Sequence, residues 1–310
     1  MPGSSRSDIP VGSCRVIFVL VLSALAGVAG LWAKPSPALP FSHSNDPVGF
    51  EPAAVSFIST NRGWALGLAG CANCAGLRMT HDGGARWSAL PSPRVPLSFY
   101  SGASRAVTDV AFADARNGFL FGPGLLTTHD GGRTWRRQSL PPIRTLGVGV
   151  GYAYAMARSR TGAGVGIWRA AIGTDFWTQL SLPVAVEKLS PAVTTDTLQL
   201  AVEGHTVVLL HGGSNGPAVD RGERGRIWVS SDSGTNWRAR AVPCTPADGG
   251  ATVVAISRAH PHSLMVDCFD NEQSSQEQNT QHHLYRTTDT GSSWARIRDP
   301  TRHNLPRGVH

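Results

Sequence analysis

Four aspartates recur in this sequence with the same neighbours, and they are the first residues to consider for acid–base chemistry. Each stands in an eight-residue pattern, [Ser/Thr]-x-Asp-x-Gly-x-x-Trp, which we call the Asp motif. Its copies are Thr80–Trp87, Thr128–Trp135, Ser230–Trp237 and Thr287–Trp294. Glycoside hydrolysis needs two carboxyl groups flanking the scissile bond, whereas each motif supplies one carboxylate beside a glycine. We therefore expect these aspartates to be structural.

Each part of the Asp motif has a use in a tight hairpin. The Asp carboxylate can accept backbone N–H bonds, Gly takes a positive φ, and Trp covers the junction between repeats with a large apolar ring. The residues predicted to have these roles are Asp82, Gly84, Trp87, Asp130, Gly132, Trp135, Asp232, Gly234, Trp237, Asp289, Gly291 and Trp294.

Eleven histidines raise the question of a metal site. The closest pairs are His260 with His262 and His282 with His283. Adjacent strand residues point to opposite faces, so His282 and His283 cannot both face one ion if they lie in a strand. His81 and His129 occupy the variable second position of the Asp motif and are expected to be exposed in turns. We predict no metal site and no cofactor.

The spacing of the motifs shows the element that positions these residues. A proline stands six residues after each motif Trp, and the same offset links Trp177 to Pro183, which reveals a fifth, degenerate copy at Ala170–Trp177. The five Trp positions are separated by 48, 42, 60 and 57 residues. A four-stranded propeller blade with loop insertions has such a period, roughly 40–50 residues.

Alternating apolar runs within each repeat predict four strands. We predict an all-β, five-bladed β-propeller of antiparallel blades, with six or seven blades as the alternative. The expected blades are 51–93, 94–141, 142–183, 184–243 and 244–300, followed by a tail at 301–310. The innermost strands, predicted to line the channel, are Ala54–Ser59, Val107–Ala113, Thr145–Val150, Thr197–Glu203 and Ala251–Ser257.

The Asp motifs resemble the Asp-box, or BNR, repeat of β-propeller proteins. In the first two repeats, Phe57 and Phe112 each stand six residues before a Gly that is followed by an aromatic residue. This layout resembles the propellers of the photosystem II assembly and stability factor type. The resemblance implies a propeller fold; because the later repeats keep only the Asp motif and strand rhythm, it does not carry the photosynthetic role.

Asp-box propellers include sialidases, which share an Arg triad, a Tyr nucleophile with a Glu partner, and an Arg-Ile-Pro motif. This sequence has no Arg-Ile-Pro, and the predicted innermost strands contain no Arg. Its tyrosines show no recognisable pairing with Glu; they are Tyr100, Tyr152, Tyr154 and Tyr285. We therefore predict no catalytic residues, with sialidase-like glycoside hydrolysis kept as the alternative function.

The net charge of +7 comes almost wholly from arginine, since Lys34 and Lys188 are the only lysines. Nucleic-acid binding would require clustered Lys and Arg with interleaved aromatic residues. The sequence has no such stripe, so we predict no nucleic-acid partner.

The N-terminus indicates an extracytoplasmic protein. Arg6 and Arg15 precede the apolar stretch Val16–Ala33, so residues 1–33 are predicted to be a signal peptide or membrane anchor, and 34–50 a Pro-rich linker. The apolar stretch is near the lower limit for a membrane span, about 17–20 residues. Secretion and anchoring therefore both stay open.

Four cysteines follow the apolar stretch, and they fit an oxidising compartment. Strand topology places all four on the face opposite the Asp motifs, which favours the pairs Cys71–Cys74 and Cys244–Cys268. A four-Cys zinc site is the alternative, and it would require reduced thiolates.

Long loops between strands two and three share that same face. They are Ala69–Gly76, Gly212–Gly225 and Asp270–Gln281. Long loops on a rigid scaffold commonly carry binding. The arginines on or beside this face are predicted to form a binding face: Arg94, Arg105, Arg144, Arg221, Arg224 and Arg226.

These observations favour a non-catalytic propeller that acts as a protein-binding or assembly scaffold. The predicted partner is a protein or an anionic envelope polymer. A carbohydrate-binding lectin without hydrolysis is the third alternative, after the glycoside hydrolase.

Overall fold

A computed structural model of the chain describes residues 49–69, 74–97, 106–158, 165–187, 198–211, 225–244, 250–257, 259–260, 262–269 and 282–297. All of them belong to one compact unit, residues 46–310. The predicted signal or anchor segment, almost all of the linker, and the tail lie outside the described residues. In the part of the chain that is described, no helix is both long and apolar enough to cross a membrane.

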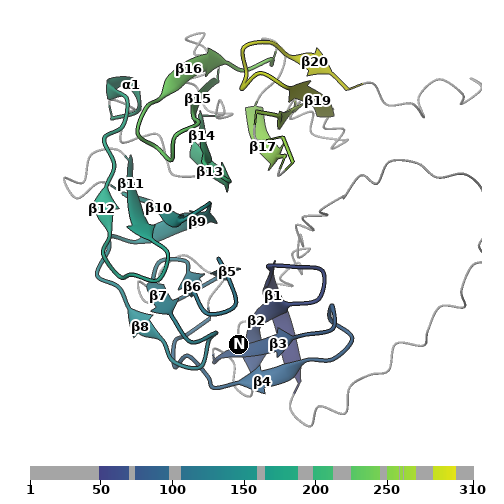
Figure 1. The fold of residues 1–310 in the computed structure, drawn as a ribbon, viewed down its shortest axis with the longest axis vertical. Helices are drawn as coiled ribbons and strands as arrows, with labels where there is room; N and C mark the ends of the chain where they lie inside the picture. Colours follow the sequence, from purple (N-terminus) through teal and green to yellow (C-terminus); the bar gives the residue numbers. More distant parts are fainter. Residues whose placement is uncertain are drawn as a thin grey trace, which may run out of the picture. The chain divides into compact units, whose positions relative to one another are not determined.

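The described strands form five antiparallel sheets of four strands, each with its strands side by side in chain order. Figure 1 shows these sheets following one another along the chain. Blade 1 consists of β1 (Phe50–Phe57), β2 (Gly63–Ala69), β3 (Ala75–Thr80) and β4 (Ser88–Leu90). Blade 2 consists of β5 (Asp109–Phe112), β6 (Gly118–Phe121), β7 (Leu125–Thr128) and β8 (Arg136–Arg137).

The remaining sheets repeat this order. Blade 3 consists of β9 (Ile143–Val148), β10 (Tyr152–Arg158), β11 (Val165–Ala171) and β12 (Thr178–Gln179). Blade 4 consists of β13 (Leu198–Glu203), β14 (Thr206–His211), β15 (Arg226–Ser230) and β16 (Arg238–Ala241). Blade 5 consists of β17 (Gly250–Ile256), β18 (Leu264–Phe269), β19 (His282–Thr287) and β20 (Ala295–Arg296). A four-residue helix, α1 (Val184–Glu187), follows blade 3.

This topology confirms the predicted fold class, a five-bladed β-propeller of four-stranded antiparallel blades. Trp177 lies between β11 and β12, in the three-to-four hairpin predicted for the degenerate repeat. One innermost strand differs in a way that affects the chemistry: β9 begins at Ile143 and therefore includes Arg144. The innermost strand of blade 3 was predicted to begin at Thr145 and to contain no Arg; this prediction is wrong, because the strand begins two residues earlier. Arg144 falls at the register shift of the β9–β10 pair, where an extra residue leaves the alternating pattern.

The hydrophobic core lies between neighbouring blades. Four clusters of buried side chains each combine residues of two successive blades. At the junction of blades 1 and 2, the rings of Trp64 and Phe112 stack with centroids 3.7 Å apart. The Trp64 indole Nε1 also donates to the Gly131 carbonyl oxygen of blade 2 at 3.1 Å. Because the apolar faces are buried against each other, every blade depends on its neighbour for stability.

The Asp motif of blade 2 forms a closed hydrogen-bond network in its turn. The Asp130 Oδ1 accepts bonds from the Thr128 hydroxyl at 2.8 Å and from the backbone N–H groups of Arg133 and Thr134, both at 2.9 Å. The Gly132 N–H donates to Thr128 Oγ1 at 3.0 Å. The intact motifs of blades 1, 4 and 5 have the same Ser/Thr-to-Asp and Gly-to-Ser/Thr bonds.

The intact turns need two successive residues with positive φ. In blade 2, Gly131 and Gly132 have φ values of 78° and 94°. In blades 4 and 5 the first of these positions is held by Ser233 (φ 60°) and Thr290 (φ 57°), which are not glycines. A residue with a Cβ is strained in this region, so the surrounding hydrogen bonds must hold these two turns in place.

One predicted disulfide is present. Cys244, after β16, is bonded to Cys268 of β18, with their Cα atoms 5.4 Å apart. Cys74 is also disulfide-bonded, while its predicted partner Cys71 lies outside the described residues. The Cys244–Cys268 bond connects blade 4 with blade 5, and it excludes these two cysteines as zinc ligands in the oxidised protein.

Candidate binding groove between blades 2 and 3

The turn of blade 3 occupies the place of an Asp motif but is built differently. It has lost the Ser/Thr and Asp of the motif, with Ala170 and Ile172 in their places. The Thr174 N–H donates to the Ala171 carbonyl oxygen at 3.0 Å, and Gly173 has a φ of 85°. This is a β-turn whose third residue takes the positive φ that glycine tolerates. The turn therefore closes without a carboxylate inside it.

The aspartate that this turn does contain, Asp175, extends to blade 2. Its Oδ1 accepts a hydrogen bond from the Thr127 hydroxyl at 2.6 Å, and its Oδ2 lies 3.3 Å from the Arg136 guanidinium. His129 Nε2 lies 3.4 Å from the same Oδ1. The Asp175 side chain is 19 % exposed, and Thr127 is fully buried. Asp175 is thus anchored to the neighbouring blade and not to its own turn.

The second nitrogen of the His129 ring continues this network. His129 Nδ1 lies 2.8 Å from Asn117 Oδ1, and the Asn117 Nδ2 donates to Asp114 Oδ2 at 2.8 Å. The bond to Asp114 fixes the orientation of the amide, so an acceptor oxygen faces the histidine. His129 therefore lies between two acceptors, Asn117 Oδ1 and Asp175 Oδ1.

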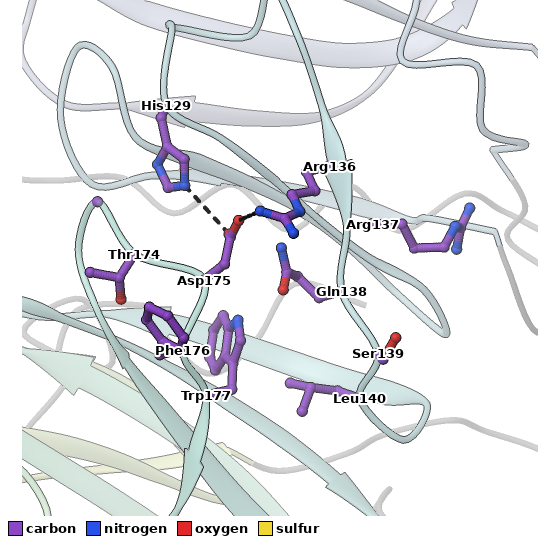
Figure 2. Close-up of a pocket in the computed structure, with 11 residues that line it drawn as sticks. His129, Arg136, Arg137, Gln138, Ser139, Leu140, Thr174, Asp175, Phe176 and Trp177 are labelled. Atoms are coloured by element: carbon purple, nitrogen blue, oxygen red, sulfur yellow. Dashed lines mark hydrogen bonds and ion pairs between the residues drawn. The ribbon is translucent and has the colours of Figure 1, made fainter.

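A groove of about 590 Å³ lies beside this network (Figure 2). We call it the blade 2–3 groove. It is lined by His129, Arg136, Arg137, Gln138, Ser139 and Leu140 of blade 2 and by Gly173, Thr174, Asp175, Phe176 and Trp177 of blade 3. Phe176 is 84 % exposed, so a large apolar side chain is accessible beside the two arginines.

The charges of the groove are unbalanced. Arg136 and Arg137 carry two positive charges, and Asp175 is the one carboxylate among the lining residues. The Arg136 side chain is 79 % exposed and meets Asp175 through one nitrogen, Nη1. Much of its guanidinium fork therefore remains accessible to a ligand. The groove combines cationic donors with an exposed aromatic ring, a composition enriched at protein interfaces.

The aspartates of the intact motifs lie in their turns and show strongly stabilised charged forms. Hydrogen bonds from the backbone and side chain of Asn236 lower the pKa of Asp232 to about 2. Partial burial acts to raise the pKa of Asp130, but bonds from Thr134, Thr128 and Arg133 outweigh it and lower that pKa to about 2. A general acid requires the opposite shift. In the described part of the chain, no group of His, Cys, Asp or Glu residues is placed to hold a metal ion.

Half of the predicted binding face can be located. Arg94, Arg144 and Arg226 are exposed and belong to or follow three different blades. Arg105, Arg221 and Arg224 lie outside the described residues, as do the loops at 212–224 and 270–281. The predicted binding face therefore stays a prediction.

Sequence reasoning missed the groove residues. His129 was expected to be no more than an exposed turn residue, and Asp175 received no role, because blade 3 departs from the motif. The signal available in the sequence was the loss of the motif itself. This turn lacks the motif carboxylate, contains Asp175 at another position, and exposes Phe176.

Comparisons with known proteins add to the description of the fold. No protein-family model matches the chain, and no curated protein matches it in sequence. Solved structures that resemble it include YCF48 bound to a D1 peptide, with a TM-score of 0.47 and 15 % identity over 80 % of this chain and 66 % of that one. YCF48 from Cyanidioschyzon merolae has a TM-score of 0.42 and 15 % identity, covering 84 % of this chain and 88 % of that one.

A GH74 xyloglucanase from Xanthomonas campestris is also similar, with a TM-score of 0.49 and 13 % identity over 79 % of this chain. The present chain spans 38 % of that enzyme and just under two thirds of the peptide-bound YCF48 chain. At these identities and TM-scores the similarity carries no inference about ligands or activity. The class of protein, a five-bladed β-propeller, rests on the sheet topology.

Proposed function

We propose that this propeller is a non-catalytic scaffold that binds a protein partner outside the cytoplasm. The observation that carries the proposal is the blade 2–3 groove, in which exposed Arg136 and Phe176 stand together on a rigid framework. Arginine and aromatic residues dominate the binding energy of protein interfaces. The blades supply the rigidity, because each buries its faces against a neighbour.

The chemistry of the groove favours binding over hydrolysis. A glycosidase requires two carboxyl groups placed on either side of the bond that it cleaves. The groove contains one, Asp175, and both of its oxygens already accept bonds from blade 2. Its role is to hold side chains in position, which is what a binding site needs.

The extracytoplasmic location is supported by two independent features. Residues 1–33 have the charge and hydropathy pattern of a signal peptide or anchor. The Cys244–Cys268 disulfide is a bond that persists in oxidising compartments and is rare in the cytosol. Fractionation of cells that express the full chain tests this part of the proposal: recovery of the protein in the cytosol with both cysteines reduced would contradict it.

Binding can be tested by photo-crosslinking in intact cells followed by pull-down from the envelope fraction. Two charge-reversed variants would be compared with the wild type: Arg136→Glu with Arg137→Glu in the groove, and Arg221→Glu, Arg224→Glu and Arg226→Glu on the predicted binding face. We expect the wild type to capture a defined protein and the groove variant to lose it at an unchanged melting temperature. Loss only in the second variant would move the binding site to the loop face, and capture of nothing by the wild type would overturn the proposal.

A further inference from the structure

We propose that the blade 2–3 groove takes an acidic, extended segment of a partner protein, with a carboxylate on Arg136 and a large apolar side chain against Phe176. This inference rests on the proposed scaffold function and specifies the chemistry of its partner. It follows from the exposure of Arg136 and Phe176 and from the contacts that hold Arg136 in place.

The anion-binding part of the groove is Arg136. One nitrogen of its guanidinium contacts Asp175 at 3.3 Å, and the side chain is 79 % exposed. A guanidinium presents five N–H donors in a planar fork that matches a carboxylate. Because Asp175 also interacts with Thr127 and His129, it steadies Arg136 without using up the donors of the fork. A ligand carboxylate can therefore form the second ion pair of an already oriented arginine.

Gln138 adds to this part without competing for the ligand. Arg136 and Gln138 are two residues apart along the edge of blade 2, so they point to the same face of the strand. The Gln138 Nε2 donates to Thr127 Oγ1 at 2.8 Å, which is the hydroxyl that donates to Asp175. The bonds from Gln138 to Thr127, from Thr127 to Asp175 and from Arg136 to Asp175 hold the two blades in one arrangement. Such preorganisation lowers the entropic cost of binding.

The apolar part of the groove is Phe176. Phe176 is 84 % exposed as a residue, whereas the adjacent Trp177 is partly buried in the core between blades 2 and 3. Figure 2 shows the two rings beside each other on the blade 3 side of the groove, with Arg136 and Gln138 on the opposite side. A ligand that spans the groove would therefore meet a cation on one side and an aromatic ring on the other.

These two parts favour a peptide over an anionic polysaccharide. A polysaccharide can offer Phe176 only the C–H face of a sugar ring, and its charged groups recur at one fixed spacing. A peptide can supply a carboxylate and an apolar side chain a few residues apart, and in extended form it rises about 3.3 Å per residue. The partner segment is accordingly expected to contain Asp or Glu close to Leu, Ile, Phe, Tyr or Trp.

The probes for a direct test are three synthetic 12-residue peptides read by fluorescence anisotropy at low salt. The first contains Glu and Leu in a Gly-Ser background, the second replaces Glu by Lys, and the third replaces Leu by Ser. We expect the first peptide to bind and the other two to bind at least about tenfold more weakly. Sodium chloride should weaken binding of the first peptide, since exposed ion pairs are screened.

The variants divide the site into its parts. Arg136→Ala and Phe176→Ala should each weaken the Glu-Leu peptide about five- to tenfold, while Arg86→Ala, an exposed arginine in the turn of blade 1, should leave it unchanged. Asp175→Asn keeps an acceptor for Thr127 but removes the ion pair that orients Arg136, so it should weaken binding several-fold. Unaltered binding would show that Asp175 does not position Arg136 for the ligand.

The outcomes separate this inference from the broader function. Equal effects of Arg136→Ala and Arg86→Ala would show non-specific attraction to positive charge and overturn the inference. A second contrary result is that polygalacturonate binds more strongly than any peptide and loses this binding in Arg136→Ala. That result would show that the ligand of the groove is an anionic polysaccharide and would overturn the inference. If none of the peptides binds while the envelope pull-down still yields a protein that does not require Arg136, the inference fails and the scaffold function stands.

Discussion

The three-to-four turns of blades 2 and 3 hold the same place in the repeat and use aspartate in opposite ways. In blade 2, Asp130 lies within the turn and accepts its bonds from Thr128, Arg133 and Thr134. In blade 3, Asp175 lies outside the hydrogen bonds of its turn and binds Thr127 and Arg136 of the neighbouring blade. Both turns contain a glycine with positive φ and a Trp that packs between blades, although Gly173 stands at the position of Gly131 and Thr174 at that of the motif glycine Gly132.

The difference shows that a turn at this place in the repeat can close without the carboxylate when one glycine takes a positive φ. Once Gly173 and the Thr174–Ala171 bond close the turn, the aspartate is available for a contact between blades. The aspartate of blade 3 forms its hydrogen bonds with blade 2 and not within its own turn. The blade 2–3 groove lies beside these bonds.

The largest effect is expected from adding a methyl group to the glycines of the two turns. Gly132→Ala would place its Cβ 2.8 Å from Leu77 Cδ2 and 3.2 Å from Leu90 Cδ1 of blade 1, at a φ of 94°. Backbone strain and overpacking together should cost about 2–4 kcal/mol of unfolding free energy. At Gly173 the nearest atom is Asn117 Oδ1 at 3.8 Å, so Gly173→Ala should cost about 1–2 kcal/mol from strain alone. Urea denaturation measures both; equal losses would show that blade 2 tolerates the added atom by moving.

The second test removes the two carboxylates. Asp130→Ala leaves the N–H groups of Arg133 and Thr134 without their acceptor and should cost about 1–3 kcal/mol of unfolding free energy. Asp175→Ala removes the bond from the buried Thr127 hydroxyl and an exposed ion pair of little value, so about 0.5–1.5 kcal/mol is expected. Thermal melting of the two variants would reveal the order. A larger loss at Asp175 would mean that the contact between blades matters more than the integrity of the turn.

The third test is acid denaturation. The pKa of Asp130 is lowered to about 2 in the folded protein, below the value of about 3.9 for an unfolded aspartate. A lowered pKa in the folded state contributes stability that is complete above the unfolded pKa and is lost as pH falls through the folded pKa. The wild type should therefore lose stability between about pH 4 and pH 2, and Asp130→Asn should lose less over that interval. Parallel curves for the two proteins would contradict this role of the carboxylate.

The smallest effect concerns the tryptophans that follow the two turns. The Trp135 Nε1 donates to the Gly132 carbonyl oxygen at 3.1 Å, whereas the buried Trp177 Nε1 has no partner among the described residues. Trp135→Phe should therefore cost about 0.5–1.5 kcal/mol more than Trp177→Phe, the net value of one hydrogen bond. Chemical denaturation of the pair measures this difference. A greater loss for Trp177→Phe would indicate that its indole has a partner after all.

The architecture could be predicted from the sequence because the same motif recurs once in each blade, in degenerate form in blade 3. The Trp-to-Pro offset identified Trp177 and with it the fifth blade, and apolar alternation placed the strands within a few residues. It did not predict the positive φ of Ser233 and Thr290, since residue type alone favours glycine there. Nor did it place Arg144 on β9, where a register shift breaks the alternation that marks a strand.

The blade 2–3 groove could not be predicted from the sequence, because it depends on contacts between distant residues. Thr127 and Asp175 are 48 residues apart, and the bond between them depends on how two blades pack. Periodicity describes what the repeats share, whereas the contacts of Asp175 with Thr127, His129 and Arg136 depend on how blades 2 and 3 pack against each other. Departures from a repeat are therefore the positions to inspect first for function.

The Cys244–Cys268 bond also determines how the protein can come apart. Blade 5 packs on β13 and β14 of blade 4, and its opening would be a local event before global unfolding. The disulfide spans 24 residues, so an opened blade 5 stays tethered close to its docking surface and re-docks by a short intramolecular search. Hydrogen exchange of the β18 and β19 amides should accelerate after reduction while exchange in blade 2 stays slow. We therefore expect the bond to lengthen the lifetime of the assembled blade, and limited proteolysis before and after reduction would measure this effect.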